Sequence, residues 1–127
     1  MDKRCLCLDT NVIIELFRGN LEVKRVIEEF PGSIATTTIT VMELLTNMSE
    51  RKRDLYLQFL SGLIILDFDF RSTIIAADII RDLKKKGLVL DLRDIMIASI
   101  CIANSVPLYT LNRKHFERLK EYGLILI

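Results

Sequence analysis

The sequence has a single histidine, His115, and lacks the glycine-rich motifs that cradle nucleotide phosphates. One histidine excludes acid–base chemistry by a histidine pair and argues against a cysteine–histidine nucleophile. Neither G-x-G-x-x-G nor G-x-x-x-x-G-K-[ST] occurs, so the usual dinucleotide and nucleoside triphosphate sites are not expected. No apolar run approaches the roughly 20 residues that a membrane-spanning helix needs, which predicts that no segment crosses a membrane.

The sequence also lacks a large excess of charge of one sign and a C-x-x-C pair of cysteines. The 18 basic and 17 acidic residues give a formal net charge of +1, which argues against a strongly basic nucleic-acid coat but leaves room for a local patch. Cys5, Cys7 and Cys101 lie in apolar surroundings without a C-x-x-C pair or a nearby histidine, so we expect free buried thiols and no metal site. Such thiols are typical of a reducing compartment and predict a cytoplasmic protein.

The composition is typical of a compact globular domain. Of the 127 residues, 50% are hydrophobic and 28% are charged. This length is enough for one hydrophobic core, and no linker or internal repeat divides it. We therefore expect one domain over residues 1–127.

The apolar run 5–8, which stops at Asp9, organises the rest of the sequence. An apolar run without polar alternation indicates a strand buried on both faces, as in a parallel sheet covered by helices. Asp9, Thr10 and Asn11 are N-cap residue types, and a helical pattern follows over 12–18. The acid therefore lies where a strand passes into a helix, at the edge of an open α/β sheet where ligands bind.

Strand patterns alternate with helix patterns along the whole sequence. Strands are predicted at 5–8, 33–39, 63–67, 107–110 and 123–127. Helices are predicted at 12–18, 21–30, 40–48, 50–60, 70–86, 91–103 and 112–121. This alternation predicts an α/β fold with a parallel sheet of about five strands and helices on both faces.

The predicted topology brings several oxygen-bearing side chains to one edge of the sheet. A helix that leaves a parallel strand begins at the carboxyl edge, and so does a helix that returns the chain to the start of the next strand. Asp9, Glu43, Asp94 and Asn112 all lie at such positions. Three carboxylates and an amide oxygen are hard ligands that suit Mg²⁺ or Mn²⁺. Asp94 is the most informative, because the helix behind it is almost entirely apolar and a charge there requires a partner.

Helix capping is the alternative interpretation of each acid. Asp9 and Asp91 have the positions of N-caps, and Thr40 with Glu43 has the spacing of a capping box. Asp94 in a first turn also suits the helix dipole. Only the gathering of three acids at one edge favours a functional site over four separate caps. His115 is interpreted as a surface or helix-start residue.

Four segments together resemble the PIN-domain ribonucleases, of the VapC type found in toxin–antitoxin pairs. The segments are LDTNV at 8–12, TVMELL at 40–45, DLRDIMIA at 91–98 and LYTLNRKHF at 108–116. Each is short, but their order and spacing match over the whole chain. The resemblance implies a PIN-like fold.

The resemblance also implies roles for individual residues. Asp9, Glu43 and Asp94 match the ligands of Mg²⁺ or Mn²⁺, and Asn112 stands where the fourth motif often has another aspartate. Supporting positions match Thr10, Asn11 and Thr110, while Asp91 is expected to cap its helix, with a role behind the metal ligands as the alternative.

The expected function is metal-dependent endoribonuclease activity, with a 5′-phosphate and a 3′-hydroxyl as products. RNA is the expected substrate, approached through Arg93, Arg113 and Lys114. A cognate antitoxin and a homodimer are the expected partners. Candidate apolar residues for the dimer lie in the helices 50–60 and 70–86, namely Leu55, Phe59, Ile75 and Ile79.

Two other functions remain open from the sequence. A phosphoreceiver-like signalling module would use Asp67, at the end of a predicted strand, as its phosphoacceptor. A catalytically inactive PIN-like domain would serve only in binding or assembly, although the presence of all three acids argues against this.

Overall fold

The computed structural model describes residues 4–127, so residues 1–3 of the expected domain lie outside the described chain. In chain order the elements are β1 (Cys5–Leu8), α1 (Thr10–Phe17), α2 (Leu21–Glu29), β2 (Ser33–Thr37), α3 (Thr38–Thr46), α4 (Glu50–Leu60), β3 (Ile64–Leu66), α5 (Phe70–Lys85), α6 (Leu92–Asn104), β4 (Leu108–Tyr109), α7 (Arg113–Phe116) and the 3-10 helix η1 (Glu117–Tyr122). The helix expected at 112–121 is thus two short pieces, α7 and η1. No helix within residues 4–127 combines the length and the apolar character needed to cross a membrane.

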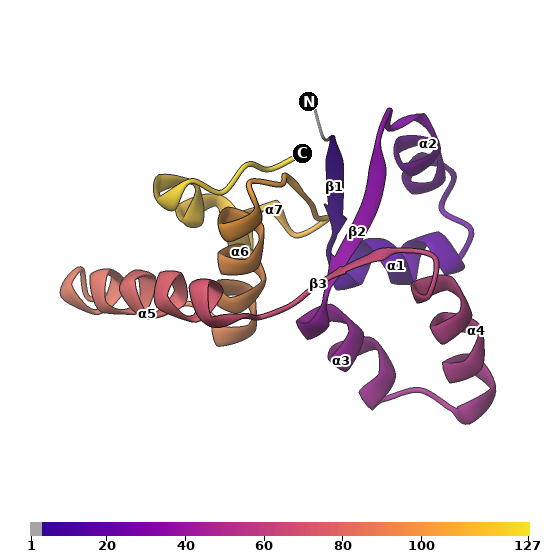
Figure 1. Ribbon diagram of the computed structural model, residues 1–127, viewed down its shortest axis with the longest axis horizontal. Coiled ribbons are helices and arrows are strands. Elements are labelled where there is room, and N and C mark those ends of the chain that lie inside the picture. The colour runs from indigo at the N-terminus through magenta and orange to yellow at the C-terminus, as the bar shows by residue number, and fades with distance from the viewer. Residues whose placement is uncertain (1–3) are drawn as a thin grey trace.

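The sheet is parallel throughout, with the strand order β3-β2-β1-β4. Helices cover both faces, as predicted: Figure 1 shows α5 and α6 on one side of the sheet and α1, α2 and α4 on the other. The central strand β1 pairs with β2 over its whole length and with β4 at its carboxyl end. The α/β prediction is therefore confirmed.

The prediction of about five strands is wrong by one, because residues 123–127 form no full strand. They meet β4 only through a parallel bridge between Leu126 and Leu108, with backbone hydrogen bonds of 2.8 and 2.9 Å on either side of it. The strand β4 has only two residues, so it offers too short an edge for a further strand to extend along.

Alternation along β1 divides the apolar interior into two cores. Cys7 belongs to the core beneath α5 and α6, whereas Leu6 and Leu8 belong to the core beneath α1, α2 and α4. Successive side chains of a strand point to opposite faces, so an all-apolar strand can supply both cores at once. All three side chains are fully buried, which fixes β1 as the centre of the molecule.

The start of α3 differs from the prediction and changes the role of Glu43. The hydroxyl of Thr37, the last residue of β2, accepts the Thr40 backbone N–H at 3.1 Å and is the N-cap. The helix therefore begins at Thr38, and the expected capping box of Thr40 with Glu43 is wrong. The buried Thr37 caps the helix directly because β2 passes into α3 without a loop. Glu43 consequently lies in the second turn, where its side chain is not needed for capping.

The candidate dimer residues prove to have different environments. Ile79 is buried in the core, and Ile75 and Phe59 are partly buried against the two cores, whereas Leu55 is exposed. The prediction was wrong for Ile79 because its position on α5 faces α6, the helix with which α5 packs most extensively. All three cysteines are free, and Cys7 and Cys101 are buried.

Candidate active site

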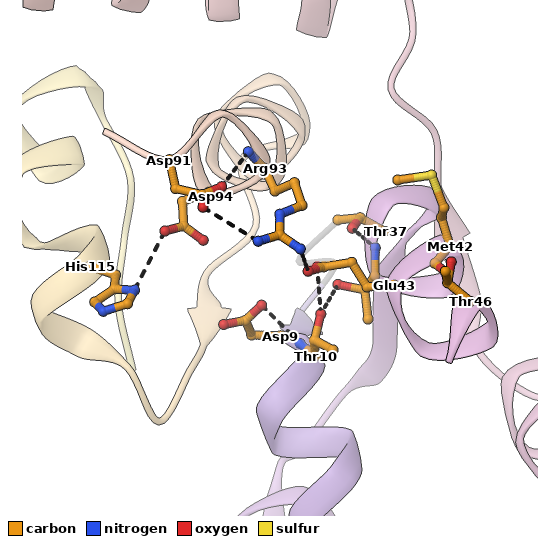
Figure 2. Close-up of polar contacts among 11 residues, drawn as sticks. Asp9, Thr10, Thr37, Met42, Glu43, Thr46, Asp91, Arg93, Asp94 and His115 are labelled. Carbon is orange, nitrogen blue, oxygen red and sulfur yellow. Dashed lines mark hydrogen bonds and ion pairs between the residues drawn. The ribbon is translucent and has the colours of Figure 1, made fainter. Parts of the chain in front are cut away.

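The residues singled out at the carboxyl edge line one cavity of about 280 Å³. Asp9 follows β1, Glu43 comes from α3, Asp94 from α6, and Asn112 precedes α7. The remaining lining residues are Thr10, Asn11, Ile14, Asp91, Arg93 and His115. Figure 2 shows Asp9, Glu43 and Asp94 turned toward the same space from three different elements. Segments separated by most of the chain therefore meet here.

Asp9 is the most deeply placed of these acids, with only 6% of its surface exposed. Its Oδ1 accepts the Thr10 backbone N–H at 2.8 Å, and its Oδ2 accepts the Thr110 hydroxyl at 2.7 Å. Burial raises the pKa of Asp9, while these hydrogen bonds from Thr110 and Thr10 act in the opposite direction. Asp9 is thus both the N-cap of α1 and a carboxylate of the cavity.

Thr110 links Asp9 to the segment that carries Asn112. The Thr110 hydroxyl also accepts the Asn112 backbone N–H at 3.0 Å, and the Asp9 N–H donates to the Tyr109 carbonyl at 2.9 Å. The Asn11 side chain accepts the Leu111 N–H at 3.2 Å. Thr110 and Asn11 therefore hold the loop after β4 against the end of β1. The side chain of Asn112 makes no capping bond to α7 and lies at the exposed rim.

Glu43 has both carboxylate oxygens engaged. Its Oε1 accepts the Thr10 hydroxyl at 2.9 Å, and its Oε2 pairs with Arg93 Nη1 at 3.1 Å. The same Thr10 hydroxyl lies 3.2 Å from the hydroxyl of Thr40. Thr10 is therefore a structural partner of Glu43, as its predicted supporting position suggested.

Asp94 lies in the first turn of α6, and Asp91 is the N-cap of this helix, as predicted. Burial raises the pKa of the Asp94 carboxyl to about 6, and the negative charges of Asp91 and Asp9 add to the effect. His115 lies beside it, with Nδ1 3.6 Å from Asp94 Oδ2. Asp94 is thus the acid whose negative charge is least well accommodated.

Sequence reasoning missed two side chains of the cavity that carry nitrogen donors. His115 was interpreted as a surface residue, and Arg93 as a guide for RNA, but both contact the acids. The available signal was position: His115 comes one turn after Asn112, and Arg93 directly precedes Asp94, so both belong to the same edge. Arg113 and Lys114 are exposed, as expected for residues that meet a ligand from solution.

Asp67 does not share this site. It follows the edge strand β3, is exposed, and does not line the acidic cavity. A phosphoreceiver-like module needs its phosphoacceptor inside an acidic pocket, so the arrangement gives no support to that alternative.

Donor chemistry at the cavity suits a hard divalent cation, because three carboxylates face one space and two of them have raised pKa values. Within residues 4–127, however, no three histidine, cysteine, aspartate or glutamate side chains form a ready-made metal-binding cluster. In this arrangement one carboxylate oxygen of Glu43 is directed to the Arg93 guanidinium.

The raised pKa of Asp94 predicts how its replacement changes stability. Because the folded-state pKa of about 6 exceeds the ordinary 3.8, ionised Asp94 disfavours the folded state, fully above about pH 6 and not at all below about pH 4. In EDTA at pH 7.5, Asp94→Asn should raise the free energy of unfolding by about 2 kcal/mol, after allowance for the lost helix-dipole interaction. Urea unfolding between pH 4 and 7.5 measures this difference.

The gain should shrink as the pH falls through 6 and become small near 4, because Asp94 is then protonated in the folded state and about half protonated in the unfolded state. Asp54→Asn, at an exposed acid of α4, controls for loss of one negative charge and should change little. A lower stability of Asp94→Asn at every pH would show instead that the negative charge stabilises the helix start.

Comparison with known proteins agrees with this architecture. The family model for the PIN domain matches residues 6–122. Ribonuclease VapC1 of Methanocaldococcus jannaschii is 39% identical over 120 residues, which cover 94% of this chain and 84% of that protein. Ribonuclease VapC2 of Rickettsia felis is 32% identical over 124 residues, which cover 88% of this chain and 90% of that protein.

Solved structures give the same result for the fold. The crystal structure of VapBC2 from Rickettsia felis, bound to a DNA fragment from their promoter, contains a chain that matches with a TM-score of 0.85 and 28% identity over 97% of both chains. DNA-bound VapBC from Salmonella typhimurium matches with a TM-score of 0.80 and 26% identity, over 98% of this chain and 97% of that one. The chain therefore belongs to the PIN domain family, in the group of the VapC ribonucleases.

Proposed function

We propose that this protein is a metal-dependent endoribonuclease and the toxin of a toxin–antitoxin pair. The observation that carries the proposal is the meeting of Asp9, Glu43 and Asp94 in one cavity, in a chain whose relatives are ribonucleases. RNA is the substrate and the phosphodiester bond is the bond hydrolysed. Free thiols and an RNA substrate are consistent with action in the cytoplasm.

Asp9, Glu43 and Asp94 are the residues that would hold Mg²⁺ or Mn²⁺. When bound, such a cation supplies Lewis-acid polarisation of the phosphate and lowers the pKa of a water ligand. The chain itself fixes the carboxylates: Thr110 and the Thr10 amide orient Asp9, and the Thr10 hydroxyl orients Glu43. Asn112 offers a neutral amide at the rim, suited to orienting water or substrate.

Binding of RNA needs positive charge near the acids, because phosphate contacts supply most of the affinity for nucleic acid. Arg113 and Lys114 provide exposed charges on α7, directly after Asn112. Their position lets a phosphate backbone approach the cavity without being repelled by its carboxylates alone. The products expected from the family carry a 5′-phosphate and a 3′-hydroxyl at the cleaved bond.

Charge removal at the acids provides the central test. Asp9→Asn and Glu43→Gln should each abolish cleavage of structured RNA in Mg²⁺ or Mn²⁺, because each removes a negative charge from the proposed ligand set. Asp67→Asn is the matched control, since this acid also follows a strand but lies outside the cavity. Gel analysis of labelled RNA, with circular dichroism for folding, measures the outcome.

Retention of full activity in both site variants would contradict the nuclease proposal. An inactive wild-type protein that still binds RNA or a protein partner would favour the inactive PIN-like alternative. Loss of an acid-labile phosphate in Asp67→Asn, with phosphate present on the wild type, would instead revive the phosphoreceiver alternative.

We also propose a homodimer, formed through exposed apolar residues in α3 and at the start of α5. Phe70 is 80% exposed, and Met42 and Ile74 are also exposed. The two helix starts are neighbours, since the Phe68 N–H donates to the Thr38 hydroxyl at 3.3 Å. Three large apolar side chains in this region form a surface that a second copy can cover.

Light scattering at micromolar concentration should give twice the chain mass of 14.7 kDa. Phe70→Asp should shift the protein to monomer, because a charge in an apolar interface is left without a partner. Leu21→Asp, at an equally exposed position on α2, should leave the dimer intact. A monomeric wild type would contradict the proposal.

The third proposed partner is a small antitoxin protein that covers the acidic cavity. Solved VapBC structures are toxin–antitoxin complexes in which similar chains occur, and this supports a partner of the same kind. Co-expression with a short protein encoded beside this one should yield a stable complex without RNA cleavage. Cleavage by the purified complex at the rate of the free protein would contradict occlusion of the cavity.

A further inference from the structure

Arg93 bridges the cavity from α6 to α3. Its Nη1 lies 3.1 Å from Glu43 Oε2 and its Nη2 lies 3.5 Å from Asp91 Oδ2. Figure 2 shows the guanidinium reaching from the start of α6 to Glu43 across the space between the two helices. These two residues are 50 positions apart in the sequence, so this ion pair is a tertiary contact.

The three acids proposed to hold the cation differ in how far their negative charge is compensated. Asp9 is held by a hydroxyl and a backbone amide, which are neutral donors and leave its charge in place. Asp94 has an imidazole at 3.6 Å, which carries charge only when protonated. Glu43 alone is paired with a permanently charged guanidinium. Its charge is therefore cancelled in a way that the charges of Asp9 and Asp94 are not.

The Arg93 guanidinium and a divalent cation compete for the negative charge of Glu43. A Mg²⁺ ligand oxygen lies about 2.1 Å from the ion, so a guanidinium bonded to the same oxygen would face a double positive charge at close range. The other oxygen of Glu43 already accepts the Thr10 hydroxyl. Glu43 therefore binds a cation more strongly once Arg93 has moved away.

We propose that Arg93 is an internal counter-ion that competes with the divalent cation for Glu43 and is displaced when the cation binds. This inference rests on the proposed function. The Arg93 side chain is 58% exposed, so it can swing into solvent without disturbing the core. The displaced guanidinium then stands at the rim of the cavity, where its planar donor fork suits an RNA phosphate.

Direct measurement of Mn²⁺ binding to metal-free protein, by calorimetry or electron paramagnetic resonance, tests this competition. Arg93→Gln should bind Mn²⁺ about two- to fivefold more tightly than wild type, the range expected for release of one exposed ion pair. Arg93→Lys keeps the charge but loses the fork, so its affinity should lie between the two. Arg113→Gln removes a cation from the same edge without a contact to Glu43 and should leave Mn²⁺ affinity unchanged.

Thermal melting gives a second readout that does not depend on activity. In EDTA, Arg93→Gln should melt below wild type because Glu43 and Asp91 lose the counter-ion that they share. In saturating Mn²⁺ the two melting temperatures should converge, so the metal-induced shift is larger in the variant.

Two results would overturn the inference while leaving the proposed function intact. One is Mn²⁺ binding by Arg93→Gln that is equal to or weaker than that of wild type. The other is equal tightening in Arg113→Gln, which would reduce the effect to general charge. Absence of Mn²⁺ binding in every variant, including Arg93→Gln, would overturn the metal-dependent function and the inference together.

Discussion

The hydrogen bond from Thr110 to Asp9 is the contact on which the site depends. A carboxylate at the end of a central buried strand is unfavourable unless its oxygens are satisfied, and here a hydroxyl from β4's end and the Thr10 amide satisfy them. The same Thr110 hydroxyl receives the Asn112 amide. One buried acid therefore fixes the end of β1, the start of α1 and the loop after β4 relative to one another. The positions of the other cavity residues follow from that frame.

Capping and a place in the functional cavity are not alternatives for Asp9. Its Oδ1 accepts the first N–H of α1, yet the residue also lines the acidic cavity. On α6 the two roles are divided: Asp91 is the N-cap, and Asp94, three residues later, lies at the cavity with its charge poorly accommodated. On α3, Thr37 is the cap and Glu43 has no such role. Helices begin at the carboxyl edge of a parallel sheet, where ligands also bind. N-caps and ligand-binding residues are therefore of the same types and lie in the same region.

The sequence pattern was sufficient to predict which residues lie at the carboxyl edge of the sheet. It was not sufficient to predict which side chains contact one another across that edge. The apolar run of β1 and the alternation of strands and helices placed Asp9, Glu43, Asp94 and Asn112 together, because topology alone decides which end of each helix lies at that edge. The prediction of a fifth strand was wrong because the pairing of that strand depends on the length of β4, which is a tertiary property. The predicted cap of α3 was wrong because Thr37 and Thr40 are equally suitable as N-caps by residue type. The pairing of Arg93 with Glu43 depends on side-chain direction across two helices, which no sequence spacing encodes.

The negative charges of the cavity explain why basic side chains lie beside the acids. The chain as a whole is nearly neutral, with a formal net charge of +1, yet Asp9, Glu43, Asp91 and Asp94 share one small space. Burial raises the pKa values of Asp9 and Asp94, and the neighbouring negative charges add to the effect at both residues. Arg93 offsets part of this repulsion from within the fold, and His115 does so only when it is protonated. Neither side chain is buried, so both can move without disturbing the core, as the proposed exchange of Arg93 for a divalent cation requires. The cavity thus combines partly compensated acids with a remaining negative charge, and this remaining charge is what the proposed cation would bind.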